Sequence, residues 1–184
     1  MGEITEEGPM TPLMVIAVAA VSGGGKTTVT KKLKERLPGA EALFFDAYEF
    51  EGAPENITEW VEKGPDYNQW NLGPLMEDIR SVRQASFLIL DYPFSYKHEK
   101  MKSWIDYSVF IDTPLDIAMA RRLLRDEEAQ VVKEELTHYL QAGRKAYVEM
   151  LPSIKPDADL IVDGTLGVEV IAEHIIKNLP FNHH

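Results

Sequence analysis

The chain has 184 residues, of which 45% are hydrophobic and 27% charged, and these values fit one soluble globular domain with a sizeable core. Its formal net charge of −11 argues against nucleic acid as a general partner, because no basic excess exists to neutralise a phosphate backbone. The absence of cysteine excludes disulfides, thiol nucleophiles and thiolate zinc sites, and it suits a reducing cytoplasm, which is the location we expect.

The two ends of the chain are expected to lie outside the folded part. Residues 1–12 carry three glutamates, which is the wrong charge for a targeting peptide, and they are interpreted as a loose N-terminal arm. Residues 181–184 are interpreted as a C-terminal tail. A single domain is predicted over residues 13–180, and its first apolar run is too short to cross a bilayer, so no membrane role is expected.

The apolar run 14–21 predicts a buried strand, and a cluster of small residues and a lysine follow it at once. A glycine loop between a strand and a helix is typical of a phosphate-binding P-loop, although Ala20 stands where the G-x-x-x-x-G-K-[ST] pattern has its first glycine. The bland alternative is a flexible turn followed by a solvated lysine. The expected nucleotide-binding residues are Ser22, Gly23, Gly24, Gly25, Lys26, Thr27 and Thr28.

Further along the chain, apolar runs alternate with helical patterns. Strands are predicted at 42–45, 87–90, 109–111 and 160–162. Helices are predicted at 26–37, 74–82, 115–128, 133–150 (ended by Pro152) and 168–179, with an irregular excursion at 51–71 that holds a short helix at 57–63. The alternation predicts an α/β protein, a three-layer αβα P-loop NTPase fold with a parallel sheet of about five strands.

Ligands of such a sheet bind at the carboxyl ends of its strands, and two aspartates follow strands there. Asp91 ends an apolar run in the manner of a Walker B acid, so Asp91 and Thr27 are the predicted magnesium ligands. Asp46 is then free to act as the base for an acceptor hydroxyl. Each aspartate has a duller alternative as a helix or turn cap.

Three arginines, Arg121, Arg122 and Arg125, lie in one predicted helix, and at least one is expected on phosphate. Salt bridges to Asp116, Asp126 or Glu128 would explain them nearly as well. The predicted catalytic residues are Asp46, Lys26, Arg121 and Arg125. Trp60, Tyr67 and Trp70 fit substrate stacking and ordinary packing equally well.

Four stretches resemble, in order and spacing, the uridine kinase and phosphoribulokinase group of P-loop kinases. They are IAVAAVSGGGKTT at 16–28, FDAY at 45–48, VFIDTPLDIAMARRLLRD at 109–126 and ADLIV at 158–162. The resemblance implies ATP and Mg²⁺ as cofactors and Asp46 as the catalytic base. The N-F-D-H-P-type stretch that holds the nucleoside in uridine kinases is not retained, since residues 67–71 read YNQWN.

These observations predict an ATP-dependent kinase that phosphorylates a hydroxyl of a small metabolite, uridine kinase-like in its chemistry. The predicted partners are a nucleoside triphosphate and a small hydroxyl-bearing metabolite, with neither nucleic acid nor membrane, and a homo-oligomer is left open. One alternative is a nucleotide-binding regulator or slow ATPase without an acceptor. Another, based on Ala20, is a module that has lost nucleotide binding.

Overall fold

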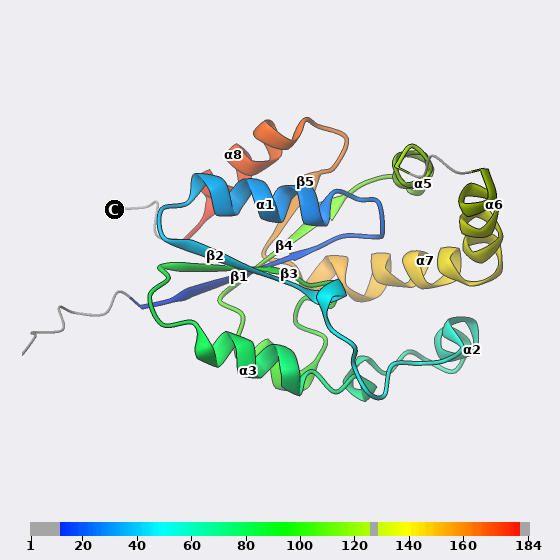
Figure 1. The fold of residues 1–184 in the computed structure, drawn as a ribbon, viewed down its shortest axis with the longest axis horizontal. Coiled ribbons are helices and arrows are strands. Elements are labelled where there is room, and N and C mark those ends of the chain that lie inside the picture. The colour runs from blue at the N-terminus through cyan, green and yellow to red at the C-terminus, as the bar shows by residue number, and fades with distance from the viewer. Residues whose placement is uncertain (1–11, 126–128, 181–184) are drawn as a thin grey trace, which may run out of the picture.

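The computed structural model describes residues 12–125 and 129–180. The predicted C-terminal tail, and the predicted N-terminal arm apart from Pro12, lie outside the described residues. Figure 1 shows a central sheet with helices above and below it. None of the helices in the described ranges is both long and apolar enough to cross a membrane.

The sheet confirms the predicted parallel arrangement of five strands. Its order is β2-β3-β1-β4-β5, and every neighbouring pair is parallel. All five carboxyl ends therefore lie at one edge, to the right in Figure 1. The bounds are β1 Met14–Ala19, β2 Ala40–Phe44, β3 Phe87–Asp91, β4 Tyr107–Asp112 and β5 Leu160–Asp163.

Successive strand residues point to opposite faces of the sheet, and each face is covered by helices. On one face Ile16 packs in a cluster with residues of α1 (Lys26–Arg36) and α8 (Val168–Asn178). On the other face Ala17 packs in a cluster with residues of α3 (Gly73–Ser81). The three-layer αβα architecture is thus confirmed, with α1 and α8 above the sheet and α3 below it in Figure 1.

The predicted excursion after β2 is present and mostly irregular. It begins in a short 3₁₀ turn, η1 (Phe45–Ala47), and contains the predicted short helix as α2 (Ile57–Glu62) and a second 3₁₀ turn, η2 (Tyr67–Gln69). A four-residue helix after β3, α4 (Glu99–Lys102), was not predicted, because so short an element carries no readable period.

The helices between β4 and β5 differ most from the prediction. The first, α5, covers Leu115–Leu123 and ends earlier than expected, and residues 126–128 lie outside the described residues. The predicted helix 133–150 is wrong in both bounds, because helical structure extends over 129–153 and includes Pro152. Pro152 lacks the N–H that would bond to the carbonyl four residues earlier, and the helix ends one residue after it, at Ser153.

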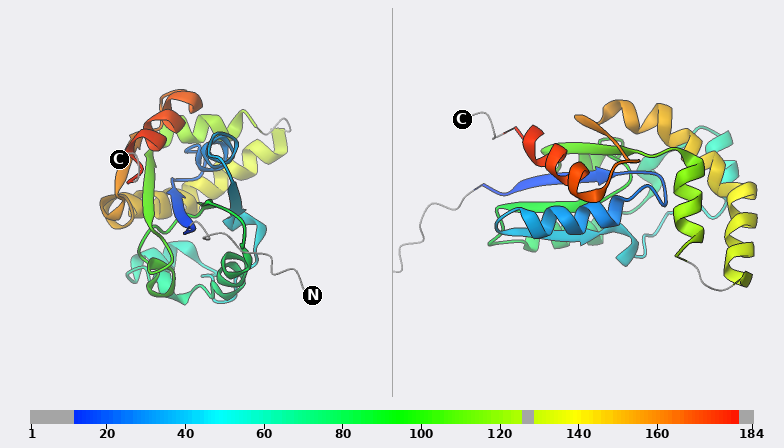
Figure 2. Two further views of the ribbon diagram at one scale, coloured as in Figure 1. Left: turned by 90° about the vertical axis from the view of Figure 1, so that its left-hand side faces the viewer. Right: turned by 90° about the horizontal axis from the view of Figure 1, so that it is seen from above.

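We call residues 129–153 the covering segment. It consists of α6 (Ala129–His138), a π-helical stretch η3 (Tyr139–Gly143) and α7 (Arg144–Ser153), and a 3₁₀ turn, η4 (Lys155–Asp157), follows it. A π turn disrupts the regular hydrogen-bond ladder and bends a helix. Figures 1 and 2 accordingly show α6 and α7 running in different directions.

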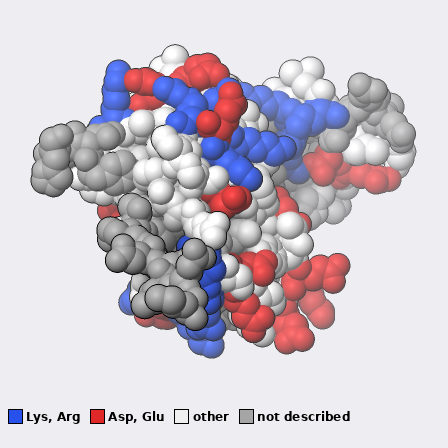
Figure 3. Space-filling model, turned by 60° about the vertical axis from the view of Figure 1, so that its left-hand side comes forward, with Lys and Arg blue, Asp and Glu red and all other residues white. Residues whose placement is uncertain are grey.

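The outer surfaces of α1 and α8 are joined by ion pairs. Lys32 Nζ lies 2.8 Å from Glu169 Oε1, and Arg36 pairs with Glu173. Figure 3 shows basic and acidic side chains interleaved over the top of the molecule, where these two helices lie, and acidic side chains gathered at the lower right. On this face the acidic side chains are therefore unevenly spread, and basic side chains lie along its lower part as well as over the top.

Candidate active site

The loop between β1 and α1 has the backbone of a phosphate cradle. Gly23 and Gly25 have φ angles of 81° and 97°, in the left-handed region that glycine adopts without strain. The Gly24 amide donates to the Val21 carbonyl at 2.8 Å, and Thr113 Oγ1 donates to the Gly24 carbonyl at 3.0 Å. The loop is thus held from within and from the end of β4.

Ala20 fits this loop because its neighbours leave room for a methyl group. It is 2% exposed, and a Cβ built on Gly24 would lie 2.9 Å from the Ala20 Cβ. The contact is permitted only because Gly24 has no side chain. The departure from the sequence pattern at Ala20 is therefore compensated locally by packing.

Helix α1 begins directly after the loop and leaves its first amides for a ligand. Its N-cap, Gly25, has no side chain with which to cap the helix, and the first turn contains no acidic residue. The first N–H groups of a helix have no partner within it and lie at the positive end of the helix dipole. An anion is the ligand that such an end favours.

Three side chains meet where β1 and β3 end. Lys26 Nζ forms an ion pair with Asp91 Oδ1, and Thr27 Oγ1 donates to Asp91 Oδ2 at 2.5 Å. Asp91 is 2% exposed, and as the last residue of β3 it lies opposite both Val18 and Phe44 in the sheet. The predicted pairing of Asp91 with the P-loop is therefore seen in the geometry, while its role toward a metal stays a prediction.

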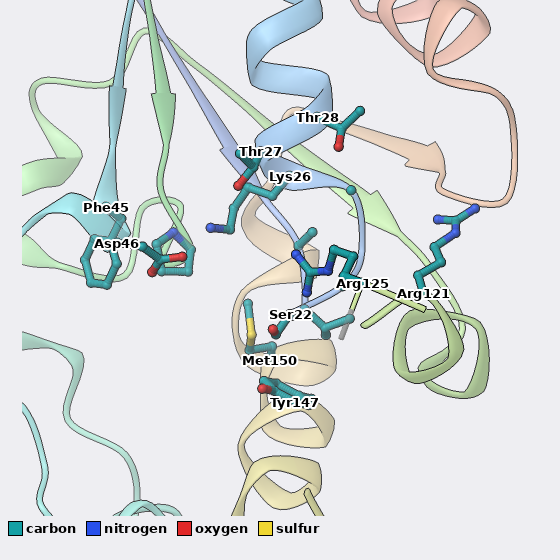
Figure 4. Close-up of a pocket in the computed structure, with 15 residues that line it drawn as sticks. Ser22, Lys26, Thr27, Thr28, Phe45, Asp46, Arg121, Arg125, Tyr147 and Met150 are labelled. Carbon is teal, nitrogen blue, oxygen red and sulfur yellow. The ribbon is translucent and has the colours of Figure 1, made fainter. Parts of the chain in front are cut away.

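Asp46 lies one strand further along the same edge. It sits in η1, directly after β2, and its side chain is exposed. Figure 4 shows its carboxylate directed toward the Lys26 amine across an open space, with Phe45 beside it. Strand order thus brings Asp46, Asp91 and the loop together from three neighbouring strands.

The loop and Asp46, but not the buried Asp91, line one cavity of about 480 Å³, within the range of small-molecule sites. The P-loop forms the floor of this cavity. Its walls come from η1, from Pro93, and from the helices α5 and α7. The residues that line it are Ala20, Val21, Ser22, Gly23, Gly25, Lys26, Thr27, Thr28, Phe45, Asp46, Pro93, Arg121, Arg125, Tyr147 and Met150.

The three arginines of α5 and its C-terminal end have different surroundings. Arg121 Nη1 donates to the Gly164 carbonyl at 2.8 Å, and Figure 4 shows it turned toward the segment after β5. Arg125 is exposed, and its guanidinium lies beside the loop in the same view. Arg122 is buried and pairs with Glu135, which the sequence did not predict. Of the partners that the sequence offered, Asp126 and Glu128 lie outside the described residues, and Asp116 forms no ion pair within the described ranges.

A second hollow of about 270 Å³ adjoins the first on the side of Arg121. The two share Gly25, Thr28 and Arg121, and the second is completed by residues 164–168 and α8. Apolar side chains such as Leu166 and Val168 form much of its lining. The second hollow therefore extends the first cavity from the start of α1 past the Arg121 guanidinium.

The aromatic residues of the excursion form a packed cluster. Tyr67 and Trp70 are 6% and 9% exposed, and the Trp60 ring centre lies 5.1 Å from that of Trp70. They are absent from the lining of the cavity, so the packing alternative describes them in this structure. Burial against Phe94 raises the pKa of Tyr67, with the nearby Glu149 carboxylate adding to the effect.

Sequence reasoning missed part of the cavity wall. Pro93, Tyr147 and Met150 face it, and the last two come from α7. Tyr147 and Met150 are three residues apart, so they lie on one side of the helix. This spacing can be seen in the sequence. The sequence predicted a helix here without a role for either residue.

The residues of the site fit both a nucleotide phosphate chain and magnesium. Left-handed glycines, an uncapped helix start and Lys26 form a cradle for anionic oxygens. The Thr27 hydroxyl and the Asp91 carboxylate, already 2.5 Å apart, are the hard oxygen donors that Mg²⁺ takes. Residues Thr27 and Asp91 would hold the ion, and the cradle would hold the phosphates.

The sheet order and the glycine loop together define a P-loop α/β protein. Solved structures support this class: a sugar kinase from a Janibacter species is 18% identical, with a TM-score of 0.57 and coverage of 90% of this chain and 94% of that one. Shikimate kinase from Bacteroides thetaiotaomicron is 17% identical, with a TM-score of 0.57 and coverage of 89% and 97%. At such identities the likeness concerns the fold alone.

In sequence the chain is similar to uridine kinases. The uridine kinase of Anoxybacillus flavithermus is 26% identical over 179 residues, which cover 81% of this chain and 85% of that protein. No family model matches the chain. The predicted resemblance to the uridine kinase group of P-loop kinases is thereby confirmed. These similarities do not assign the molecule that accepts the phosphate.

Proposed function

We propose that this protein is a cytoplasmic, Mg²⁺- and ATP-dependent kinase that transfers the γ-phosphate to a hydroxyl of a small metabolite. The observation that carries the proposal is the arrangement across one cavity, in which an exposed carboxylate, Asp46, faces Lys26 and the P-loop. A phosphate cradle and a free carboxylate on opposite sides of one space provide a donor half and an acceptor half.

In the donor half, the amides at the start of α1 and the Lys26 ammonium bind the phosphates of the nucleotide. The Lys26 ammonium, which forms an ion pair with the Asp91 carboxylate, turns toward the phosphates to contact them. Thr27 and Asp91 would hold Mg²⁺, which would supply positive charge to neutralise the phosphates. The second hollow suits the nucleotide base, since a planar guanidinium such as that of Arg121 can stack on a ring.

In the acceptor half, Asp46 orients the acceptor hydroxyl and receives its proton. The hydroxyl oxygen forms a bond to the γ-phosphorus while the bond from that phosphorus to the β–γ bridging oxygen breaks, which leaves ADP. Arg125 supplies positive charge to the transferring group, because its guanidinium lies beside the loop and forms no ion pair with a residue of the described ranges. Excluding water from the cavity strengthens these electrostatic interactions.

Asp46→Asn tests the role of the carboxylate. The variant removes the proton acceptor and leaves the cradle intact, so Mg·ATP should bind within about twofold of wild type while transfer falls by about 10²- to 10⁴-fold. Transfer is measured as ADP release stimulated by an acceptor, with uridine tested first because the relatives are named uridine kinases. Unchanged turnover in Asp46→Asn would remove Asp46 from the mechanism.

An acceptor panel separates a kinase from a slow ATPase. Nucleosides, sugars, sugar phosphates and vitamins are added singly to the protein with Mg·ATP, and ADP release is followed. A kinase shows acceleration by at least one compound and a phosphorylated product. A regulator or slow ATPase would bind Mg·ATP and show the same slow ADP release with every compound.

A further inference from the structure

Arg122 stands apart from the two arginines on either side of it. Arg121 and Arg125 both line the cavity, whereas Arg122 is not among its lining residues. It is only 7% exposed, although an arginine side chain is rarely buried unless it is paired. The contacts of Arg122 with the rest of the protein therefore explain why its side chain is buried. A ligand in the cavity would not explain this burial.

The stem of Arg122 packs directly against the phosphate loop. A Cβ built on Gly23 would lie 2.7 Å from Arg122 Cγ and 2.3 Å from the carbonyl oxygen of Ala118, both on α5. No side chain fits between the loop and this helix. The loop and α5 are therefore in tight contact at Ala118 and Arg122, so a displacement of one requires a displacement of the other.

The guanidinium end of Arg122 joins α5 to both helices of the covering segment. Nη2 forms an ion pair with Glu135 on α6, and Nη1 donates to Tyr147 Oη on α7 at 3.3 Å. The guanidinium carbon also lies 5.8 Å from the centre of the Tyr147 ring. Since Tyr147 lines the cavity, Arg122 fixes a piece of the cavity wall from behind.

The same segment is bound to the excursion on the acceptor side. Thr58 Oγ1 on α2 donates to the carbonyl of Gln141 at 3.0 Å, and Lys145 forms an ion pair with Glu62. Between these contacts, Gly143 is buried, and a Cβ on it would lie 3.4 Å from the Tyr147 ring. A continuous chain of contacts thus runs from the phosphate loop through Arg122 and Tyr147 to α2.

We infer that Arg122 is a positioning residue that links the phosphate loop to the covering segment and, through it, to α2, and that it makes no contact with phosphate. The inference deepens the proposed kinase function and rests on it for the effects on nucleotide affinity. Of the three arginines, phosphate contact is left to Arg125, whose guanidinium lies beside the loop.

Nucleotide affinity distinguishes positioning from direct contact. We expect Arg122→Met, Glu135→Gln and Tyr147→Phe each to raise the Kd of Mg·ATP by about threefold to thirtyfold, as loss of a coupling contact does. Arg122→Met/Glu135→Gln should bind no more weakly than Arg122→Met alone, because both changes break one link. Arg122→Lys, which can keep the ion pair, should recover part of the affinity.

Glu134→Gln is the matched control, because Glu134 is exposed on the same helix and accepts only from Gln130, at 2.7 Å. It should bind Mg·ATP as wild type does. Direct phosphate contact by Arg122 would give a different result: Arg122→Met would lose affinity while Glu135→Gln bound at least as tightly as wild type. Wild-type affinity in Arg122→Met would also overturn the inference.

Hydrogen exchange of the nucleotide-free protein tests the link itself. Amides at 57–62 and 139–147 should exchange faster in Arg122→Met and Glu135→Gln than in wild type or Glu134→Gln. Unchanged exchange would overturn the link. If wild type failed to bind Mg·ATP, the proposed function would fail, while the exchange result would still decide whether Arg122 joins these elements.

Discussion

At the scale of residues, the two left-handed glycines of the loop have different surroundings. A Cβ at Gly23 would collide with backbone of α5, whereas a Cβ at Gly25 meets nothing within 4 Å. Both have positive φ, so any side chain is strained at either position. Only at Gly23 is the strain combined with overpacking.

Gly23→Ala should therefore be more harmful than Gly25→Ala. We expect Gly25→Ala to lower the free energy of unfolding by ~1–2 kcal/mol, the cost of a left-handed residue. Gly23→Ala should lower it by a further ~1–3 kcal/mol, the cost of overpacking. Thermal and urea unfolding of the two variants measures the difference, and equal stability would show that α5 gives way easily.

The phenol of Tyr92 is a buried polar group without a hydrogen-bond partner among the described residues. Its side chain is fully buried, and Oη is one of the buried side-chain atoms that lack a hydrogen-bond partner in the described part of the chain. Burial raises the pKa of this phenol, so it stays protonated. A donor that is desolvated without compensation costs free energy.

Tyr92→Phe is accordingly expected to leave the free energy of unfolding unchanged or to raise it by up to ~1 kcal/mol. Tyr96→Phe is the control, because Tyr96 Oη donates to Asp159 Oδ2 at 2.5 Å and should lose stability. Urea unfolding checks both. Destabilisation of Tyr92→Phe to the same extent as Tyr96→Phe would mean that its hydroxyl is satisfied in solution.

At the scale of elements, α1 and α8 are joined by charge at their surfaces. Hydrogen bonding by Arg36, and then by Lys177, lowers the pKa of the Glu173 carboxyl, and Lys32 lowers that of Glu169. A carboxyl whose pKa is lowered by folding stabilises the folded state above its ordinary pKa of 4.5, and this contribution is lost as the pH falls below it.

Glu173→Gln should therefore differ from wild type near neutral pH and match it in acid. We expect a slightly lower melting temperature for the variant at about pH 7 and no difference at about pH 3. The pairs are exposed, so the difference should also shrink in high salt. A constant difference over this pH range would exclude the charge as its cause.

Secondary structure was predictable where the period was long and regular, as in α1, α8 and the strands. The covering segment was not, because the stretch 139–143 is π-helical, with Gly143 buried beside the Tyr147 ring, and an α-helical period does not mark such a stretch. A single sequence shows the residues of this contact but not that they meet. The burial of Arg122 was hidden for the same reason, since its partner Glu135 lies 13 residues away on another helix.

At the scale of the whole molecule, the site arises from strand order. The loop, Asp91 and Asp46 follow β1, β3 and β2, which are neighbours in the sheet although they lie far apart in sequence. The rule that ligands bind at the carboxyl ends of parallel strands made this meeting predictable. The contribution of α7 to the cavity wall depended on the path of the covering segment, which no such rule supplies.

Ligand binding to this cavity should stabilise the entire fold by mass action. At Mg·ADP concentrations 100-fold above Kd, the free energy of unfolding should rise by ~2.7 kcal/mol. Lys26→Ala should abolish most of this increase, and it should also destabilise the free protein because Asp91 loses its buried ion-pair partner. Differential scanning fluorimetry with and without Mg·ADP measures both effects. An undiminished increase in Lys26→Ala would place the nucleotide elsewhere.

The aromatic cluster of the excursion also has an optical consequence. Trp60 and Trp70, two of the three tryptophans, lie in that cluster, and the third, Trp104, lies under the guanidinium of Arg80 at 5.1 Å. Met150, on the wall of the cavity, packs in the same apolar cluster as Trp70. Intrinsic fluorescence therefore reports on the packing of the excursion next to the Met150 wall of the cavity, and a titration can be followed there without any attached dye.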